Sequence, residues 1–172
     1  MKNIIISLLF TVSLFSSTLS SERVNEIGNT INTLIFQKDN PNIYCRVETE
    51  GQWKDYQNFL CVLNKNERRL FVFNLLFTNY LADFEDLVLD NKMSKKQASI
   101  ETILFTIKNN INIFDPNDFK KFYSLLSFDS QNNVNQLLKD IKENKRYMRK
   151  AIRDTLKKLS QEEKTIIGIR EE

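Results

Sequence analysis

Apolar residues recur every three or four positions along most of the chain, in several separate stretches. Such spacing places them on one face of an α-helix, where they can be buried together. Glycine occurs three times and proline twice in 172 residues, which is too few for the frequent tight turns of a many-stranded sheet. The pattern therefore predicts an all-α fold, in a single compact domain of about six or seven helices.

Polar residues mark the starts of several of these helices. An Asn, Ser or Asp that is followed three residues later by an acid or an amide can form a capping box, which satisfies backbone N–H groups at the helix start. Asn64, Ser94, Asp115 and Ser160 all have this arrangement. We expect helices near residues 22–36, 52–63, 65–89, 95–113, 116–126, 128–158 and 161–169. The long sixth helix can break near Asn144, and residues 43–51 are the plausible extended stretch.

Residues 70–77 (LFVFNLLF) are apolar on nearly every side. A short run of this kind fits either a buried strand or a buried helix. We favour a helix because the Asn64 start precedes the run and because Tyr80, Leu81 and Phe84 continue it at helical spacing. A helix without a polar face must lie at the centre of the fold.

The first 20 residues have the layout of a secretory signal peptide. Lys2 is followed by an apolar run from Ile4 to Phe15 and then by small residues, as in such peptides. A membrane anchor is the alternative, but the run is shorter than the roughly 20 apolar residues that cross a bilayer. We therefore expect a cleaved signal peptide over residues 1–20 and a secreted, extracellular helical domain over residues 21–172.

Cys45 and Cys61 are the two cysteines of the chain. An even number of cysteines in a secreted protein usually means a disulfide, so we expect them to be bridged. Two buried free thiols are the alternative. In the loop-closure model, a crosslink of this span stabilises the fold by roughly 3 kcal/mol.

The candidate chemistry does not favour an enzyme. The chain has no histidine, which is the usual general base and the commonest metal ligand, and it has no phosphate-binding glycine loop or CxxC pair. Asp83, Glu85, Asp86 and Asp90 cluster, and paired carboxylates can hydrolyse glycosides, but a solvated acidic face is the simpler interpretation. We expect no catalytic residue, no metal site and no cofactor.

A basic run covers residues 139–158, where nine cations stand against three acids. Helical spacing places Lys142, Arg146, Arg149 and Arg153 on one stripe beside an apolar stripe. Such a helix can contact anionic lipid headgroups or the carboxylate of a fatty acid. Nucleic acid is disfavoured as a partner for an exported protein, and a solvated face of an amphipathic helix is the alternative interpretation.

Aromatic residues gather in two of the expected helices. They are Phe73, Phe77, Tyr80 and Phe84 within residues 65–89, and Phe119 and Phe122 within residues 116–126. Large rings on short helices can leave an apolar cavity among them, although aromatic stripes are more often core.

Two segments, IKNNINIFDPNDFKKFYSLL (107–126) and KENKRYMRKAIRDTLKKLSQEEKTII (142–167), resemble the nematode fatty-acid- and retinol-binding proteins. Those proteins repeat a helix, a short Leu-Ser-Pro-Glu-like cap and another apolar helix, an order that is similar here over about residues 56–168. The cap-like segments are Phe59–Glu67, Ile113–Asp118 and Leu159–Lys164. The chain departs from the family in its cysteine pair, its fewer alanines and lysines, and residues 43–53. The resemblance implies a secreted helical lipid carrier with an apolar cavity and no cofactor.

These observations support three hypotheses. In the first, the chain is a secreted carrier of fatty acids, retinol or similar small lipids: the six aromatic residues line its cavity, and Arg146, Arg149 and Arg153 attract the carboxylate of the ligand. In the second, it is a secreted, effector-like interaction domain with a packed core, which contacts a host or partner protein. In the third, the basic helix binds an anionic membrane at its surface.

Overall fold

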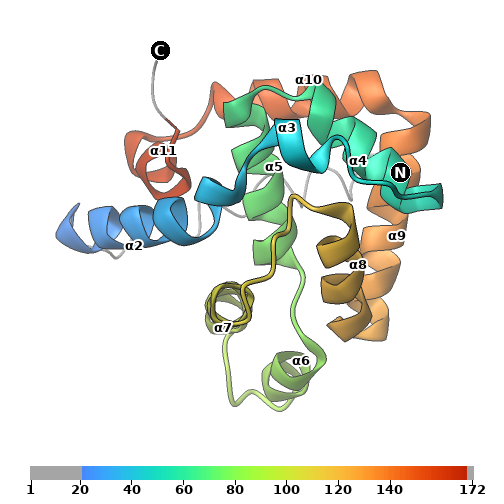
Figure 1. Ribbon diagram of the computed structural model, residues 1–172. Helices are drawn as coiled ribbons and strands as arrows, with labels where there is room; N and C mark the ends of the chain where they lie inside the picture. The colour runs from blue at the N-terminus through green and yellow to red at the C-terminus, as the bar shows by residue number, and fades with distance from the viewer. Residues whose placement is uncertain (1–20, 170–172) are drawn as a thin grey trace.

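The computed structural model describes residues 21–169, which fold into helices joined by short links (Figure 1). This range contains no β-strand, so the prediction of an all-α fold is confirmed. None of the described helices is long and apolar enough to span a membrane. The segment 1–20, where we predict a signal peptide, lies outside the described residues. The helices are α2 (Ser21–Leu34), the short 3-10 helix η2 (Phe36–Lys38), α3 (Pro41–Tyr44), α4 (Gly51–Val62), α5 (Lys65–Thr78), α6 (Ala82–Leu89), α7 (Lys95–Lys108), α8 (Pro116–Leu125), α9 (Phe128–Glu143), α10 (Lys145–Leu156) and α11 (Gln161–Ile167).

The four predicted capping residues all precede helices. Asn64, Ser94 and Ser160 form complete capping boxes, at the starts of α5, α7 and α11. Asp115 caps α8 alone, because its side chain accepts from the backbone of Asn117 and Asp118. The carboxylate of Asp118 turns away and accepts from the Asn112 backbone instead.

Helix α5 lies at the centre of the molecule, where α7, α10 and α11 pack against it (Figure 1). Every residue from Leu70 to Phe77 is buried, so this apolar run is a central helix and not a strand. In the first turns of this helix Glu67 and Arg68 are also buried, and the Glu67 side chain is 1% exposed, whereas Lys65 is exposed. The absence of a polar face over residues 70–77 thus has a direct cause, since no side of this part of the helix meets solvent.

The prediction of one continuous helix over residues 65–89 is wrong. Helix α5 ends at Thr78, and the chain then runs through Asn79 to Leu81 before α6 begins. The Asn79 side chain donates to the Leu75 carbonyl oxygen at 2.7 Å, which occupies an acceptor at the end of the helix. Leu81 forms an isolated antiparallel bridge with Leu126. The break therefore depends on a partner far away in the sequence.

Two other predictions differ from the structure, and a third agrees with it. The helix expected over residues 95–113 ends at Lys108, and Asn110 adopts a left-handed conformation with φ of 54°. The helix expected over residues 128–158 is divided at Asn144 into α9 and α10, at the position where a break was anticipated. Residues 43–51 contain no strand: Ile43 and Tyr44 belong to the short helix α3, residues 45–50 form an irregular link, and Gly51 begins α4.

The two ends of the described chain meet where α2 packs on α11 (Figure 1). Gly28 allows this close approach, since a Cβ there would lie 2.5 Å from the Thr165 carbonyl oxygen. Gly168 ends α11 in the left-handed conformation, with φ of 68°. Arg69 of α5 donates to Asn32 and to the Gly168 carbonyl oxygen, so both end helices are tied to the centre.

On the other side of α5, α4 packs against α8 and α9 (Figure 1). The chain passes from α9 to α10 at Asn144, and α10 then crosses the top of α5 in this view. Helix α6 lies at the opposite end and packs chiefly on α7. The basic run and the acidic cluster of the sequence are consequently placed at opposite ends of the molecule.

Candidate functional site

The aromatic residues predicted to line a cavity lie in or beside the core. Phe73, Phe77, Phe119 and Phe122 are buried, whereas Tyr80 and Phe84 are half-buried. The rings of Phe73 and Phe77 stack with 5.7 Å between their centroids. Phe119 instead lies against α4. The ring contacts of Phe73 and Phe77 are thus separate from those of Phe119, and lipid binding stays a prediction.

A second aromatic group surrounds Trp53 in the first turns of α4. The Trp53 ring forms T-shaped contacts with Phe119 and Tyr123, with ring centroids 5.5 Å and 5.2 Å apart. Phe119 also lies 4.3 Å from Tyr56, whose hydroxyl donates to the Ile113 carbonyl oxygen at 2.7 Å. Burial is the main reason why the pKa of Tyr56 is raised well above its ordinary value. The sequence around Trp53 indicates only a helical position, because no local signal shows which rings will surround it.

The three arginines predicted to attract a ligand carboxylate have different surroundings. Arg153 Nε donates to Glu67 Oε1 at 2.5 Å, and the other carboxylate oxygen of Glu67 accepts from the backbone of Asn64. Arg153 thereby fixes α10 to the start of α5, although its side chain remains 53% exposed. Arg146 is exposed, and Arg149 is half-buried, with an Nε that has no hydrogen-bond partner among the described atoms.

Helix α10 buries its apolar side and exposes most of its cations, Arg149 being half-buried. Met148 and Ile152 are buried against the core, which leaves the opposite side of the helix to solvent. We call the cations of this helix and the turn after it the α10 basic face. They are Lys145, Arg146, Arg149, Lys150, Arg153, Lys157 and Lys158.

Acidic residues neutralise the α10 basic face only in part. Lys150 pairs with Asp154 at 2.5 Å, and this hydrogen bond is the main cause that lowers the pKa of Asp154, with further help from the charges of Lys157 and Lys158. Arg153 pairs with Glu67. Within residues 21–169, none of Lys145, Arg146, Lys157 and Lys158 forms an ion pair.

Two open hollows flank the start of α4. The first, of about 620 Å³, lies between the link before α4 and the first turns of α8; its lining includes Trp53 and the cations Arg46, Lys54 and Lys120. The second, of about 550 Å³, lies between α4 and α9, and its lining includes the cations Lys54, Lys139 and Lys142 and the acids Asp55 and Glu143. Because Lys54 borders both hollows, they are neighbours, and the second leads through the end of α9 toward α10.

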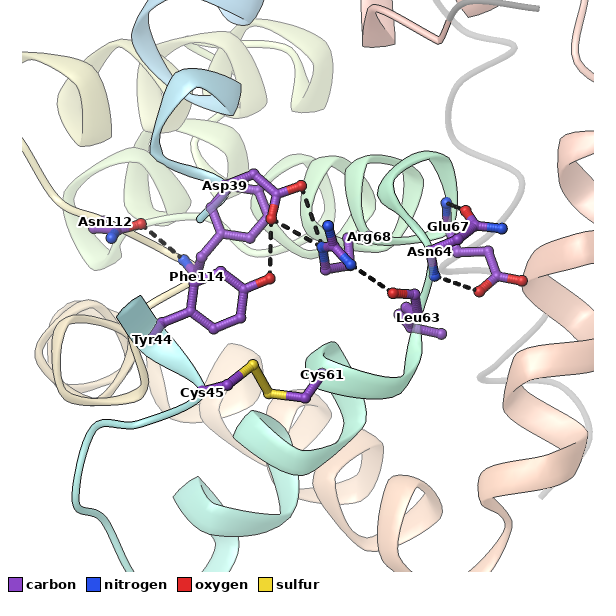
Figure 2. A network of polar contacts seen from close by, with 10 residues as sticks. All are labelled: Asp39, Tyr44, Cys45, Cys61, Leu63, Asn64, Glu67, Arg68, Asn112 and Phe114. Carbon is purple, nitrogen blue, oxygen red and sulfur yellow. Dashed lines mark hydrogen bonds and ion pairs between the residues drawn. A yellow bond between two sulfur atoms is a disulfide. The ribbon is translucent and has the colours of Figure 1, made fainter. Parts of the chain in front are cut away.

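A buried polar network connects Asp39, Tyr44 and Arg68 (Figure 2). The Asp39 side chain is 1% exposed and pairs with Arg68 Nε at 2.9 Å. Arg68 also donates to the Leu63 carbonyl oxygen, and the Tyr44 hydroxyl donates to Asp39 at 2.9 Å. The pKa of Tyr44 is raised, first by burial and then by the Asp39 charge. The network joins the link after α2 to the start of α5.

The disulfide between Cys45 and Cys61 is present, as predicted, with 6.1 Å between the two Cα atoms (Figure 2). It attaches the end of α3 to the last turn of α4. Nearby, the buried amide of Gln57 donates to the carbonyl oxygens of Tyr44 and Val47, at 2.6 and 2.7 Å. These bonds hold in place the link that forms one wall of the first hollow.

This arrangement offers fixed positive charge beside an aromatic ring. Within the described residues, no group of three or more His, Cys, Asp or Glu side chains could hold a metal ion. The chain has no significant match among protein-family models, curated proteins or solved structures. The resemblance to the nematode lipid carriers therefore stays a prediction, and the surface geometry is the basis on which a function can be proposed.

Proposed function

We propose that the chain is an exported, non-catalytic binding protein that holds a flexible polyanion along one basic edge. The observation that carries this proposal is the α10 basic face, in which Lys145, Arg146, Lys157 and Lys158 point away from a firmly anchored helix and form no ion pair within residues 21–169. Closely spaced cations on a rigid element attract an anionic ligand without the entropic cost of ordering a loop.

The mode of burial of α10 favours a polymer over a bilayer. A helix that lies in a membrane surface inserts its apolar side between the lipids, but the apolar side of α10 contacts the core through Met148 and Ile152. The cations also continue from α10 to Lys142 and Lys139 of α9 and to Lys54 of α4. This path passes from α10 over the end of α9 to α4, and a flexible chain can follow cations on these successive helices.

A binding measurement with heparin as the probe polymer tests the proposal. We expect heparin to bind with an affinity that falls steeply with added salt, because exposed charges are screened. The double variant Lys145→Gln/Arg146→Gln should bind about five- to tenfold more weakly at low salt, since two exposed charges contribute on the order of 1 kcal/mol together. The matched control, Lys95→Gln/Lys108→Gln on α7, has the same change in net charge and should bind almost normally.

Two results would replace this proposal. Equal loss of heparin binding in both variants would show that net charge, and not the α10 basic face, determines binding. Saturable uptake of a fluorescent fatty acid that oleate or retinol displaces would instead support the lipid carrier predicted from the sequence. Anionic vesicles provide the third comparison, and binding to them that is tighter than binding to heparin would favour the membrane hypothesis.

A further inference from the structure

The first hollow contains a fixed aromatic platform. Trp53 is the only tryptophan of the chain, and it is half-buried, so part of its ring is covered and part borders the hollow. Edge contacts from the buried Phe119 and from Tyr123 hold the ring in one orientation. A flat apolar ring that cannot swing away is suited to stacking against a flat ligand face.

The rim of this hollow is polar and carries both charge signs. Arg46 and Lys120 are exposed and face the same hollow from the link before α4 and from α8. Lys54 borders it as well and donates to Gln57 at 2.8 Å. Glu48 and Glu50 add carboxylate acceptors. A few placed polar groups around an apolar surface determine the orientation of a ligand in a binding site.

These features together match the chemistry of an acidic sugar. The C–H face of a pyranose ring is apolar and stacks on an indole, its hydroxyl groups donate to carboxylates, and a carboxylate or sulfate substituent accepts from Lys and Arg. An acyl chain would make no use of these polar groups, and an open hollow would leave much of its apolar surface in water. An acidic peptide would satisfy the cations but would have no use for the stacking platform.

The walls of the hollow are held before any ligand arrives. The Gln57 amide donates hydrogen bonds to the carbonyl oxygens of Tyr44 and Val47. The Cys45–Cys61 disulfide attaches the same link before α4 to the end of that helix. Arg46 lies between these anchor points in the sequence. A prearranged site loses less conformational entropy on binding, which raises the affinity for a small ligand.

We propose that the Trp53 hollow is a subsite for one carboxylate- or sulfate-bearing sugar unit of an acidic glycan. This inference rests on the proposed function and specifies its ligand, because Lys54 joins the hollow to the second one, and Lys142 of the second hollow leads to the α10 basic face. A glycan with one ring on Trp53 would extend along that path. The hollow would bind the sugar ring itself, whereas the α10 basic face would bind only the negative charges of the glycan.

The fluorescence of Trp53 tests this assignment directly, because no other tryptophan contributes to the signal. The disulfide-bonded protein is titrated with a heparin-derived hexasaccharide, with neutral maltohexaose and with hexaglutamate. We expect a saturable change in Trp53 emission with the acidic hexasaccharide and little change with the other two. Arg46→Gln/Lys120→Gln should weaken hexasaccharide binding about tenfold, whereas Lys95→Gln/Lys108→Gln should leave it unchanged.

The outcomes separate this inference from the proposed function. If heparin still binds in an α10-dependent way but the hexasaccharide leaves Trp53 emission unchanged, the subsite is wrong and the proposed function stands. If hexaglutamate changes the emission as strongly as the hexasaccharide, the hollow reads charge and not a sugar ring, which also overturns the inference. Calorimetry of Trp53→Phe and Trp53→Leu gives a second measure, since stacking predicts near-normal hexasaccharide affinity for the first variant and a clear loss for the second.

Discussion

Helices α5 and α6 come from one continuous helical pattern, yet they lie in opposite environments. All residues from Leu70 to Phe77 of α5 are buried, whereas α6 contains no buried residue. Helix α5 packs against α7, α10 and α11, but α6 packs chiefly on α7. Periodicity thus indicates that a segment is helical, while the number of neighbouring elements decides how deeply it is buried.

The same difference extends to the polar groups of the two helices. Helix α5 has its first turn closed by the Asn64 capping box and by the pair between Glu67 and Arg153. Helix α6 begins at Ala82, and the residue before it, Leu81, provides no capping side chain. Its carboxylates Asp83 and Asp86 are exposed. Stability should therefore be concentrated around α5, and α6 should open locally at a much smaller free-energy cost.

The largest expected effect comes from truncating a ring in each helix. Phe73→Ala in α5 removes a buried ring that stacks on Phe77, and it should lower the free energy of unfolding by about 3–5 kcal/mol. Phe84→Ala in α6 is the matched change at a half-buried position, and we expect a loss of only about 1 kcal/mol. Urea denaturation followed by circular dichroism measures both. Equal losses would refute the contrast between the two helices.

Removal of the disulfide should have the next largest effect. The double variant Cys45→Ser/Cys61→Ser frees a link closed across a sequence separation of 16 residues, which should cost about 3 kcal/mol in the loop-closure model. Because the disulfide lies beside the start of α5, amides of α4 and α5 should lose protection in hydrogen exchange by that amount. Amides of α6, which open locally, should change little. A similar loss in both regions would mean that α6 does not open independently.

Raising the pH should lower the free energy of unfolding by less than removal of the disulfide does. The pKa of Tyr56 lies well above its ordinary value, chiefly because of burial, so only the unfolded chain ionises there. The stability contributed by the neutral hydroxyl is complete below pH 10 and is lost as the pH rises above that value, by about 1.4 kcal/mol at pH 11. Thermal unfolding from pH 8 to 11 should show a smaller decline for Tyr56→Phe than for the parent protein. An identical decline would indicate that Tyr56 is not linked to alkaline unfolding.

The smallest effect is expected at the surface of α6. Leu89 is 74% exposed, so Leu89→Ser should change the free energy of unfolding by less than about 0.5 kcal/mol. Thermal unfolding of the variant beside Phe84→Ala gives the comparison within one helix. A loss of 2 kcal/mol or more would show that α6 is covered in solution, which would make its apolar side an interface.

Much of the fold was predictable because its signals are local. The capping residues are read from four consecutive positions, and the central place of α5 follows from its lack of a polar face. The cysteine pair was recognised from its number and its expected compartment. The site was predictable only in part: Arg146 is exposed as a ligand-binding cation would be, but the partner of Arg153 is a glutamate 86 residues away in the sequence.

By itself, the sequence determined the helical class, the positions of most helix starts, the helix that had to be central and the cations of α10. The tertiary structure alone decided where the expected helix 65–89 breaks, which rings hold Trp53, and that Arg46, Lys54 and Lys120 share one hollow. The physical reason is the distance along the sequence over which each interaction acts. Capping and periodicity act between residues at most a few positions apart, whereas a hollow forms from segments that meet only after the apolar faces of their helices have packed together.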